Sequence, residues 1–213
     1  MPGTEQRPHG DPDAAGAVTA AGGGPLAVVV LDALAGADPG DSLAALLGPV
    51  AASALRRELL RGARRWAAAT ATPGGPGAFE ANTTDAALTA LHGHCGPVVF
   101  VAPDVPGLDH ALGAAVLGDL ADGVGLTFAP TFDATPYLMA TPTLDAEFLA
   151  LAGGHRDELF RTVGGRGAPV GMLRSERRLA TAADARAVAA DPSTPLELGV
   201  LLAAGLDVRI RRA

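Results

Sequence analysis

Short, uninterrupted apolar runs separated by longer helical patterns constrain the fold of this chain more than any other feature. Residues 26–31 form such a run, residues 97–102 give the best strand pattern in the chain, and residues 126–130, which include Thr127, predict a third strand. Continuous apolar runs of this length are typical of strands that are buried on both faces. Because helical patterns lie between them, the sequence predicts an α/β fold with a mostly parallel, Rossmann-like sheet flanked by helices.

The pattern between these runs predicts the remaining elements. Helices are expected at residues 49–69, 84–92 with Thr83 or Thr84 as the cap, 109–120, 144–151, 156–160, 182–190 with Thr181 as the cap, and 196–204. Further strands are expected at residues 137–140, 170–173 and 206–210, with Gly205 ending the preceding helix. Residues 70–79 are rich in turn formers and predict no central strand, and residues 164–167 predict a mobile loop.

Length and composition predict one ordered unit behind a tail. The chain has 213 residues, and residues 1–24 contain Gly, Pro, Ala and scattered charge without an apolar period. We therefore expect a disordered tail at 1–24 and a single domain at 25–213. Apolar residues make up 48% of the chain but aromatic residues only 4%, so the core is expected to consist of Ala, Leu and Val.

The charge balance argues against two classes of partner. The net charge is −7, and all 16 basic residues are Arg. Nucleic acids and acidic membranes require a basic face, so neither is an expected partner. The basic cluster at residues 56–65 lies on a predicted helix and is interpreted as a solvated helix face. A lone Cys95, no signal pattern and no apolar run of 18 residues predict a cytoplasmic protein.

Acidic residues follow two of the predicted strands. Asp104 directly ends the run at 97–102, and Asp133 follows the run at 126–130. In open α/β sheets, ligands bind beyond the carboxyl ends of the strands, where two such carboxylates can share Mg²⁺ or Mn²⁺. Aspartate is also a common helix cap and turn residue, so spacing alone leaves that structural role open.

From Val28 to about Ala190 the chain resembles the bacterial glycosyltransferase family related to arsenosugar biosynthesis, and more distantly the phospholactate guanylyltransferases. The stretches that carry the resemblance are Leu47-Gly48-Pro49, residues 96–108, which end in Pro-Asp-Val-Pro-Gly-Leu, residues 121–133, and the helical pattern at 182–190. The resemblance implies a nucleotide-diphospho-sugar transferase fold of the GT-A type, in which a nucleotide or nucleotide sugar binds with Mg²⁺ or Mn²⁺.

The resemblance also assigns expected roles to individual residues. Asp104 matches the metal- or nucleotide-facing aspartate of the family, and Asp133 matches its second acidic position. On this basis Asp104 and Asp133 are the expected metal ligands. Nucleotide-binding positions are expected at Asp32, Asp104, Asp133, Ala134 and Thr135.

The chain departs from the family at several of these places. Where the family carries a basic loop after the first strand, this chain has Asp32, Leu34, Ala37, Gly40, Asp41 and Ser42. Carboxylates at such a place repel a diphosphate, whereas Lys and Arg would bind it. The family's Gly-Gly is replaced by Ala134-Thr135, and its acidic positions before the C-terminal threonine are replaced by Arg178 and Ala180. Residues 70–79 and 163–175 look shortened, which predicts a missing strand and helix.

Two hypotheses about function follow. The first is a divergent member that has lost nucleotide-sugar transfer and acts as a binding, regulatory or assembly partner, with a protein partner or a homodimer as possible assemblies. The second is an active, metal-dependent glycosyl- or nucleotidyltransferase in which an Arg such as Arg161 or Arg166 replaces the lost cations. A dinucleotide-binding oxidoreductase is set aside because no Gly-x-Gly-x-x-Gly follows the first strand.

Overall fold

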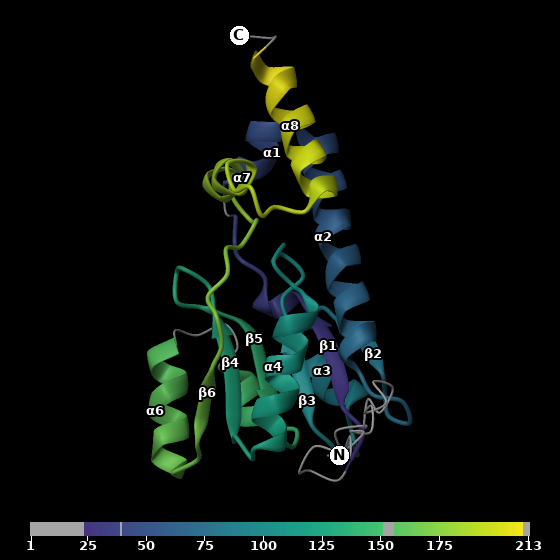
Figure 1. Ribbon diagram of the computed structural model, residues 1–213, viewed down its shortest axis with the longest axis vertical. Helices are drawn as coiled ribbons and strands as arrows, with labels where there is room; N and C mark the ends of the chain where they lie inside the picture. Colours follow the sequence, from purple (N-terminus) through teal and green to yellow (C-terminus); the bar gives the residue numbers. More distant parts are fainter. Residues whose placement is uncertain (1–23, 39, 151–155, 211–213) are drawn as a thin grey trace, which may run out of the picture.

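The protein forms a six-stranded mixed sheet with helices on both faces (Figure 1). The computed structural model describes residues 24–38, 40–150 and 156–210. Its strands are β1 (Ala27–Leu31), β2 (Ala78–Ala81), β3 (Val98–Val101), β4 (Leu126–Pro130), β5 (Pro136–Thr141) and β6 (Val170–Met172). The predicted α/β class is confirmed, and the tail expected at 1–24 lies outside the described residues apart from Gly24.

The strand order is β2-β1-β3-β5-β4-β6, and β5 is the one strand among them that runs antiparallel to its neighbours. β5 enters the sheet through a hairpin with β4 and separates β3 from β4. All residues of β1, β3, β4 and β5 are buried. The continuous apolar runs of the sequence are therefore central strands, as expected for strands covered on both faces.

The helices of the described chain are η1 (Asp32–Leu34), α1 (Ser42–Leu47), α2 (Pro49–Thr70), α3 (Thr84–Ala90), α4 (His110–Ala121), α5 (Ala146–Ala150), α6 (Arg156–Arg166), α7 (Ala182–Ala189) and α8 (Leu196–Ile210). The helices α2 and α4 lie side by side over one face of the sheet, and α3 and α5 lie on the other (Figure 1). None of the described helices is long and apolar enough to cross a membrane.

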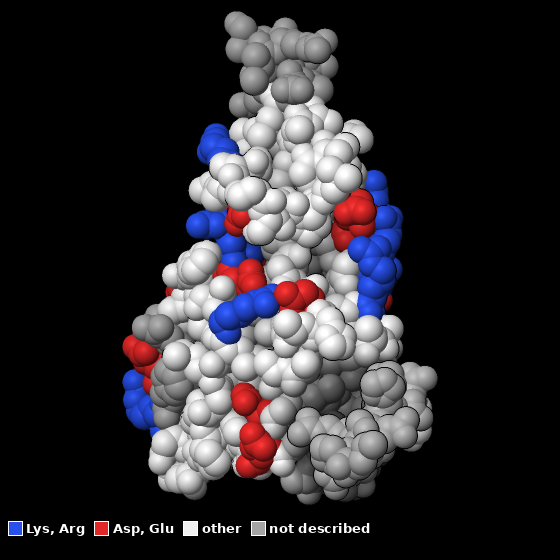
Figure 2. All heavy atoms as spheres, in the orientation of Figure 1, with Lys and Arg blue, Asp and Glu red and all other residues white. Residues whose placement is uncertain are grey.

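The caps and periodicity of the helices explain their bounds. Pro49 starts α2, whose inner face buries Leu55, Leu59 and Trp66 at helical spacing. Thr83 caps α3, and Thr181 forms a capping box with Asp184 at the start of α7. The arginines at 56–65 are exposed along the outer side of α2, where Figure 2 shows a basic stripe at the edge of the molecule.

A second hydrophobic cluster lies beyond the carboxyl ends of the strands. It joins α1, the N-terminal half of α2, α7 and α8, which together we call the helical cap (Figure 1). The cap buries Leu43, Leu55, Leu179 and Leu202 among others. The candidate site therefore lies between the carboxyl edge of the sheet and the helical cap.

Three expectations about local structure were wrong. The strand expected to be missing near residues 70–79 is present, because residues 78–81 form β2. β2 is an edge strand that pairs with β1 on one side and is half exposed, so the prediction of no central strand here is confirmed. Residues 206–210 were expected to form a strand, but they continue α8, so Gly205 does not end this helix. Gly205 instead lies close to Leu47, because a Cβ there would be 2.8 Å from the Leu47 side chain. Residues 164–167 were expected to form a mobile loop, but residues 164–166 form the last turn of α6.

Candidate functional site

A cavity of about 420 Å³ lies at the carboxyl ends of β1 and β3 beneath the helical cap. Its walls come from the loop after β1, from α2, from the end of β3 and from the segment that leads into α7. The lining residues are Asp32, Ala35, Gly36, Asp38, Arg56, Leu59, Leu60, Pro103, Asp104, Leu179 and Ala180. This is the place where open α/β sheets bind their ligands.

Asp104 is anchored at the end of β3 by contacts with its own fold. Its Oδ2 accepts a hydrogen bond of 2.7 Å from the backbone N–H of Gly36, in the loop after β1. Its backbone carbonyl accepts a hydrogen bond of 2.8 Å from the N–H of Leu179. A Cβ on Gly36 would lie 2.9 Å from Cδ of Arg178, so glycine is required for this close approach.

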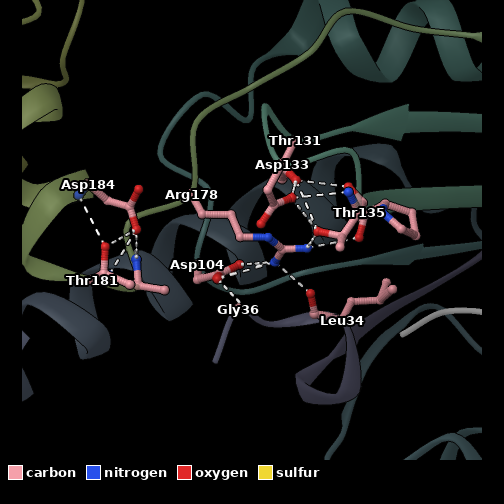
Figure 3. Close-up of polar contacts among 11 residues, drawn as sticks. Leu34, Gly36, Asp104, Thr131, Asp133, Thr135, Arg178, Thr181 and Asp184 are labelled. Carbon is pink, nitrogen blue, oxygen red and sulfur yellow. Dashed lines mark hydrogen bonds and ion pairs between the residues drawn. The ribbon is translucent and has the colours of Figure 1, made fainter. Parts of the chain in front are cut away.

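Arg178 joins the ends of three strands through its buried guanidinium (Figure 3). Nη1 donates to the carbonyl of Leu34 at 2.6 Å and to Oδ1 of Asp104 at 3.1 Å. Nη2 donates to Oγ1 of Thr135 and to the carbonyl of Pro136, both at 3.0 Å. The Arg178 side chain is 7% exposed and that of Asp104 is 12% exposed, so this is a largely desolvated ion pair.

Asp133 organises the tight turn between β4 and β5. Its Oδ1 accepts hydrogen bonds from the hydroxyl of Thr131 and from the N–H and hydroxyl of Thr135, the last at 2.6 Å. Burial raises the pKa of Asp133, but these hydrogen bonds and the charge of Arg178 outweigh it and hold the pKa below its usual value. Ala134 adopts a left-handed backbone with φ of 67°, the conformation that a glycine would favour there.

The loop after β1 carries its carboxylates in three different settings. Asp38 caps α1, because its carboxylate accepts from the N–H groups of Ser42 and Leu43 at 2.9 Å, and these bonds lower its pKa. Asp41 pairs with Arg56 at 3.1 Å on the surface. Asp32 faces the cavity, where burial and then the carboxylates of Glu80 and Asp104 raise its pKa.

The two carboxylates predicted to share a metal do not fit a divalent cation in this arrangement. The guanidinium of Arg178 lies between them, and the Asp104 carboxylate already binds Arg178 and Gly36. Among the residues that the structure describes, no three His, Cys, Asp or Glu side chains gather as metal ligands. Metal binding by Asp104 and Asp133 stays a prediction, and the titration described below tests it.

The structure gathers most of the predicted nucleotide-binding positions around one edge of the sheet. Asp32 and Asp104 line the cavity, whereas Asp133 and Thr135 lie across Arg178 from Asp104 (Figure 3). Sequence reasoning did not assign Arg178 or Gly36 to the site. One signal was available, because Arg178 stands where the resembling family carries an acid just before the helix-capping threonine.

The two arginines suggested as replacement cations lie elsewhere. Arg161 and Arg166 belong to α6, which lies beside β6 at the edge of the sheet (Figure 1). The arginines at the strand ends include Arg178, which is buried, and Arg56, whose side chain is 50% exposed at the cavity. Arg174 and Arg177 also lie there, where Arg174 donates to the carbonyl of Gly107 and Arg177 lies over Phe132.

Comparison with solved structures defines the class of fold. A protein from Desulfovibrio desulfuricans G20, assigned as a nucleotide-diphospho-sugar transferase, superposes with a TM-score of 0.65 and 17% identity over 88% of this chain and 96% of its own. The chain therefore has the nucleotide-diphospho-sugar transferase fold. No protein-family model and no curated protein sequence matches the chain.

Two further solved structures superpose less closely and add nothing to that assignment. Rv0371c from Mycobacterium tuberculosis H37Rv, in complex with manganese, gives a TM-score of 0.41 at 14% identity over 76% of this chain and 97% of its own. The 4-diphosphocytidyl-2C-methyl-D-erythritol synthase from Anaerococcus prevotii DSM 20548 gives 0.39 at 10% identity over 75% of this chain and 94% of its own.

Proposed function

We propose that this chain is a divergent relative of the nucleotide-sugar glycosyltransferases and phospholactate guanylyltransferases that has lost nucleotide-sugar transfer. In place of transfer, it serves as a binding, regulatory or assembly partner, acting on a second protein or as a homodimer. The observation that carries this proposal is the set of charges around the cavity at the ends of β1 and β3.

Three carboxylates line this cavity, those of Asp32, Asp38 and Asp104, and the guanidinium of Arg56 lies among the lining residues. Asp104 is neutralised by its ion pair with Arg178, which leaves Asp32 and Asp38 facing Arg56. Arg56 is already engaged, with Nη2 3.1 Å from Asp41 and 4.0 Å from Asp38. A carboxylate about 4 Å from a phosphate charge opposes binding by about 4 kcal/mol at an effective dielectric constant of about 20. A nucleoside diphosphate placed here would meet net repulsion.

Several backbone donors of the loop after β1 are already used within the chain. The N–H of Gly36, a group that would otherwise be available to a phosphate oxygen, donates to Asp104. The N–H groups of Ser42 and Leu43 at the start of α1 donate to Asp38. Backbone donors of this kind hold phosphates in related loop-and-helix sites, so their use within the chain supports a loss of diphosphate binding.

Thermal unfolding with added ligands tests the proposal. Nucleoside diphosphates and nucleotide sugars of each base, at 1 mM with Mg²⁺ or Mn²⁺, are expected to leave the Tm unchanged. A ligand at 100 times its Kd would stabilise the fold by about 2.7 kcal/mol, which is easily measured. A clear, metal-dependent rise in Tm with any of these nucleotides would sink the proposal.

The alternative is an active, metal-dependent glycosyl- or nucleotidyltransferase with an altered donor site. The observation that favours it is the cavity itself, which remains large enough for a small ligand and has Arg56 half exposed at its rim. Under this alternative, Asp104→Asn abolishes turnover of a nucleotide sugar. Asp122→Asn is the matched control, because Asp122 is exposed in the turn after α4. Equal turnover by both variants would refute the assignment of Asp104.

A further inference from the structure

The surroundings of Arg178 match those of a bound cation in several respects. Its guanidinium lies between acceptors supplied by three strand ends: the carbonyl of Leu34 after β1, the carboxylate of Asp104 after β3, and the first residues of β5 with the turn before them. Oxygen atoms of carboxylates, carbonyls and hydroxyls are also the ligands of a hard divalent cation. Arg178 therefore occupies an oxygen-lined position at the carboxyl edge of the sheet.

Resting on the proposed function, we propose that the guanidinium of Arg178 is a built-in replacement for a divalent cation at this edge of the sheet. It supplies the positive charge that Asp104 requires, and it excludes Mg²⁺ and Mn²⁺ from that carboxylate. Arginine suits this role because it stays protonated and its planar fork of donors can bind several oxygens at once.

The contacts explain why a metal ion does not displace this side chain. To reach Asp104, a cation must approach a guanidinium nitrogen that lies 3.1 Å from the carboxylate, or move it away from all four acceptors. Displacement would leave the carbonyls of Leu34 and Pro136 without their bonds from Arg178. The like charges and the lost hydrogen bonds both oppose metal binding.

Gly36 and Leu179 hold the replacement in position. Gly36 lies closer to Cδ of Arg178 than a residue with a side chain could. Leu179, the residue after Arg178, donates its backbone N–H to the carbonyl of Asp104. Asp133 lies across the guanidinium from Asp104, with its Oδ1 2.6 Å from the Thr135 hydroxyl that Arg178 contacts. In the wild type the guanidinium lies between these two carboxylates (Figure 3), so we expect a shorter side chain at position 178 to leave space between them.

A titration with Mn²⁺ alone tests this inference. Binding is measured by isothermal calorimetry and by the electron paramagnetic resonance signal of free Mn²⁺. The wild type is expected to show no saturable site below 1 mM. Arg178→Gln is expected to gain one Mn²⁺ site whose Kd lies at least tenfold below this 1 mM limit. The double variant Arg178→Gln with Asp104→Asn is expected to lack this site. Arg177→Gln is the matched control, because Arg177 is the exposed neighbour, and it should behave as the wild type does.

Two results would overturn the inference. One is a saturable Mn²⁺ site in the wild type that Asp104→Asn removes. The other is an Arg178→Gln protein with the circular dichroism of the wild type but no new site. Arg178→Met, which keeps part of the aliphatic stem, is the second variant if Arg178→Gln does not fold, and the wild-type titration decides by itself if neither folds.

The titration contains no nucleotide, so it is independent of the test of the proposed function. Nucleotide binding without metal would overturn the loss of ligand binding but leave the role of Arg178 intact. Mn²⁺ binding at Asp104 of the wild type would overturn the role of Arg178 whatever the nucleotide result.

Discussion

Substitution of Arg178 by glutamine removes a buried cation that links three strand ends. The glutamine amide ends near the position of Nε in arginine, so it does not reach the four acceptor groups that Nη1 and Nη2 bind. A buried acceptor that loses its donor costs about 1–3 kcal/mol, and removing one partner of a buried ion pair costs about 3–5 kcal/mol. Because Asp104 keeps its bond from Gly36 and water can enter, we expect a loss of about 3 kcal/mol.

Urea unfolding at pH 7, followed by circular dichroism, measures this loss. Arg177→Gln is the control, since Arg177 is exposed and stacks on Phe132 at 5.0 Å, an interaction that contributes no more than about 1 kcal/mol at a surface. In the double mutant with Asp104→Asn, the total loss should fall short of the sum of the single losses by at least about 1 kcal/mol. A loss below about 1 kcal/mol for Arg178→Gln, or additive losses, would refute the reasoning.

The remaining predictions concern groups elsewhere in the fold. Burial and the carboxylates of Glu80 and Asp104 raise the pKa of Asp32, so ionised Asp32 opposes folding above its folded pKa and the cost vanishes below its unfolded pKa. Asp32→Asn should therefore raise the free energy of unfolding at pH 7, by less than about 1 kcal/mol because the position is exposed, and should give no gain at pH 3. Thermal melts between pH 3 and pH 7 measure this difference. An equal gain in stability at both ends of the range would contradict the prediction. Thr141 is 4% exposed, and its hydroxyl has no partner among the described residues, so Thr141→Val should stabilise the fold by about 1 kcal/mol in urea unfolding. In α8, Gly199→Ala should gain about 0.5–1 kcal/mol because its Cβ meets open space, whereas Gly205→Ala should lose stability because its Cβ would lie 2.8 Å from Leu47; a gain from both would place α8 away from α1.

The central sheet was predictable from sequence because burial on both faces leaves a local record. The run at 98–101 is continuous and apolar, residues 126–130 are apolar except for Thr127, and Thr83 and Thr181 are standard helix caps. The edge strand at 78–81 leaves no such record, since it pairs on one side and stays half exposed. Gly205 was misjudged because a glycine that ends a helix and one that allows close packing look the same in sequence.

The candidate site was predictable in part, for a different physical reason. Asp104 could be located because it directly ends a recognisable strand. The family resemblance marked Arg178 as a departure, but its contacts could not be predicted, because its partners Leu34, Asp104 and Pro136 are 144, 74 and 42 residues away along the chain. Contacts at such separations depend on how the segment after β6 crosses the strand ends, which no local pattern encodes.

A crystal structure of the wild type grown with millimolar Mn²⁺ and a nucleotide sugar tests the account most directly. We predict that the guanidinium of Arg178 will lie between Asp104 and Thr135, as in Figure 3, with no metal ion on Asp104. Manganese bound to Asp104, with Arg178 turned away and a diphosphate beside the loop after β1, would contradict it.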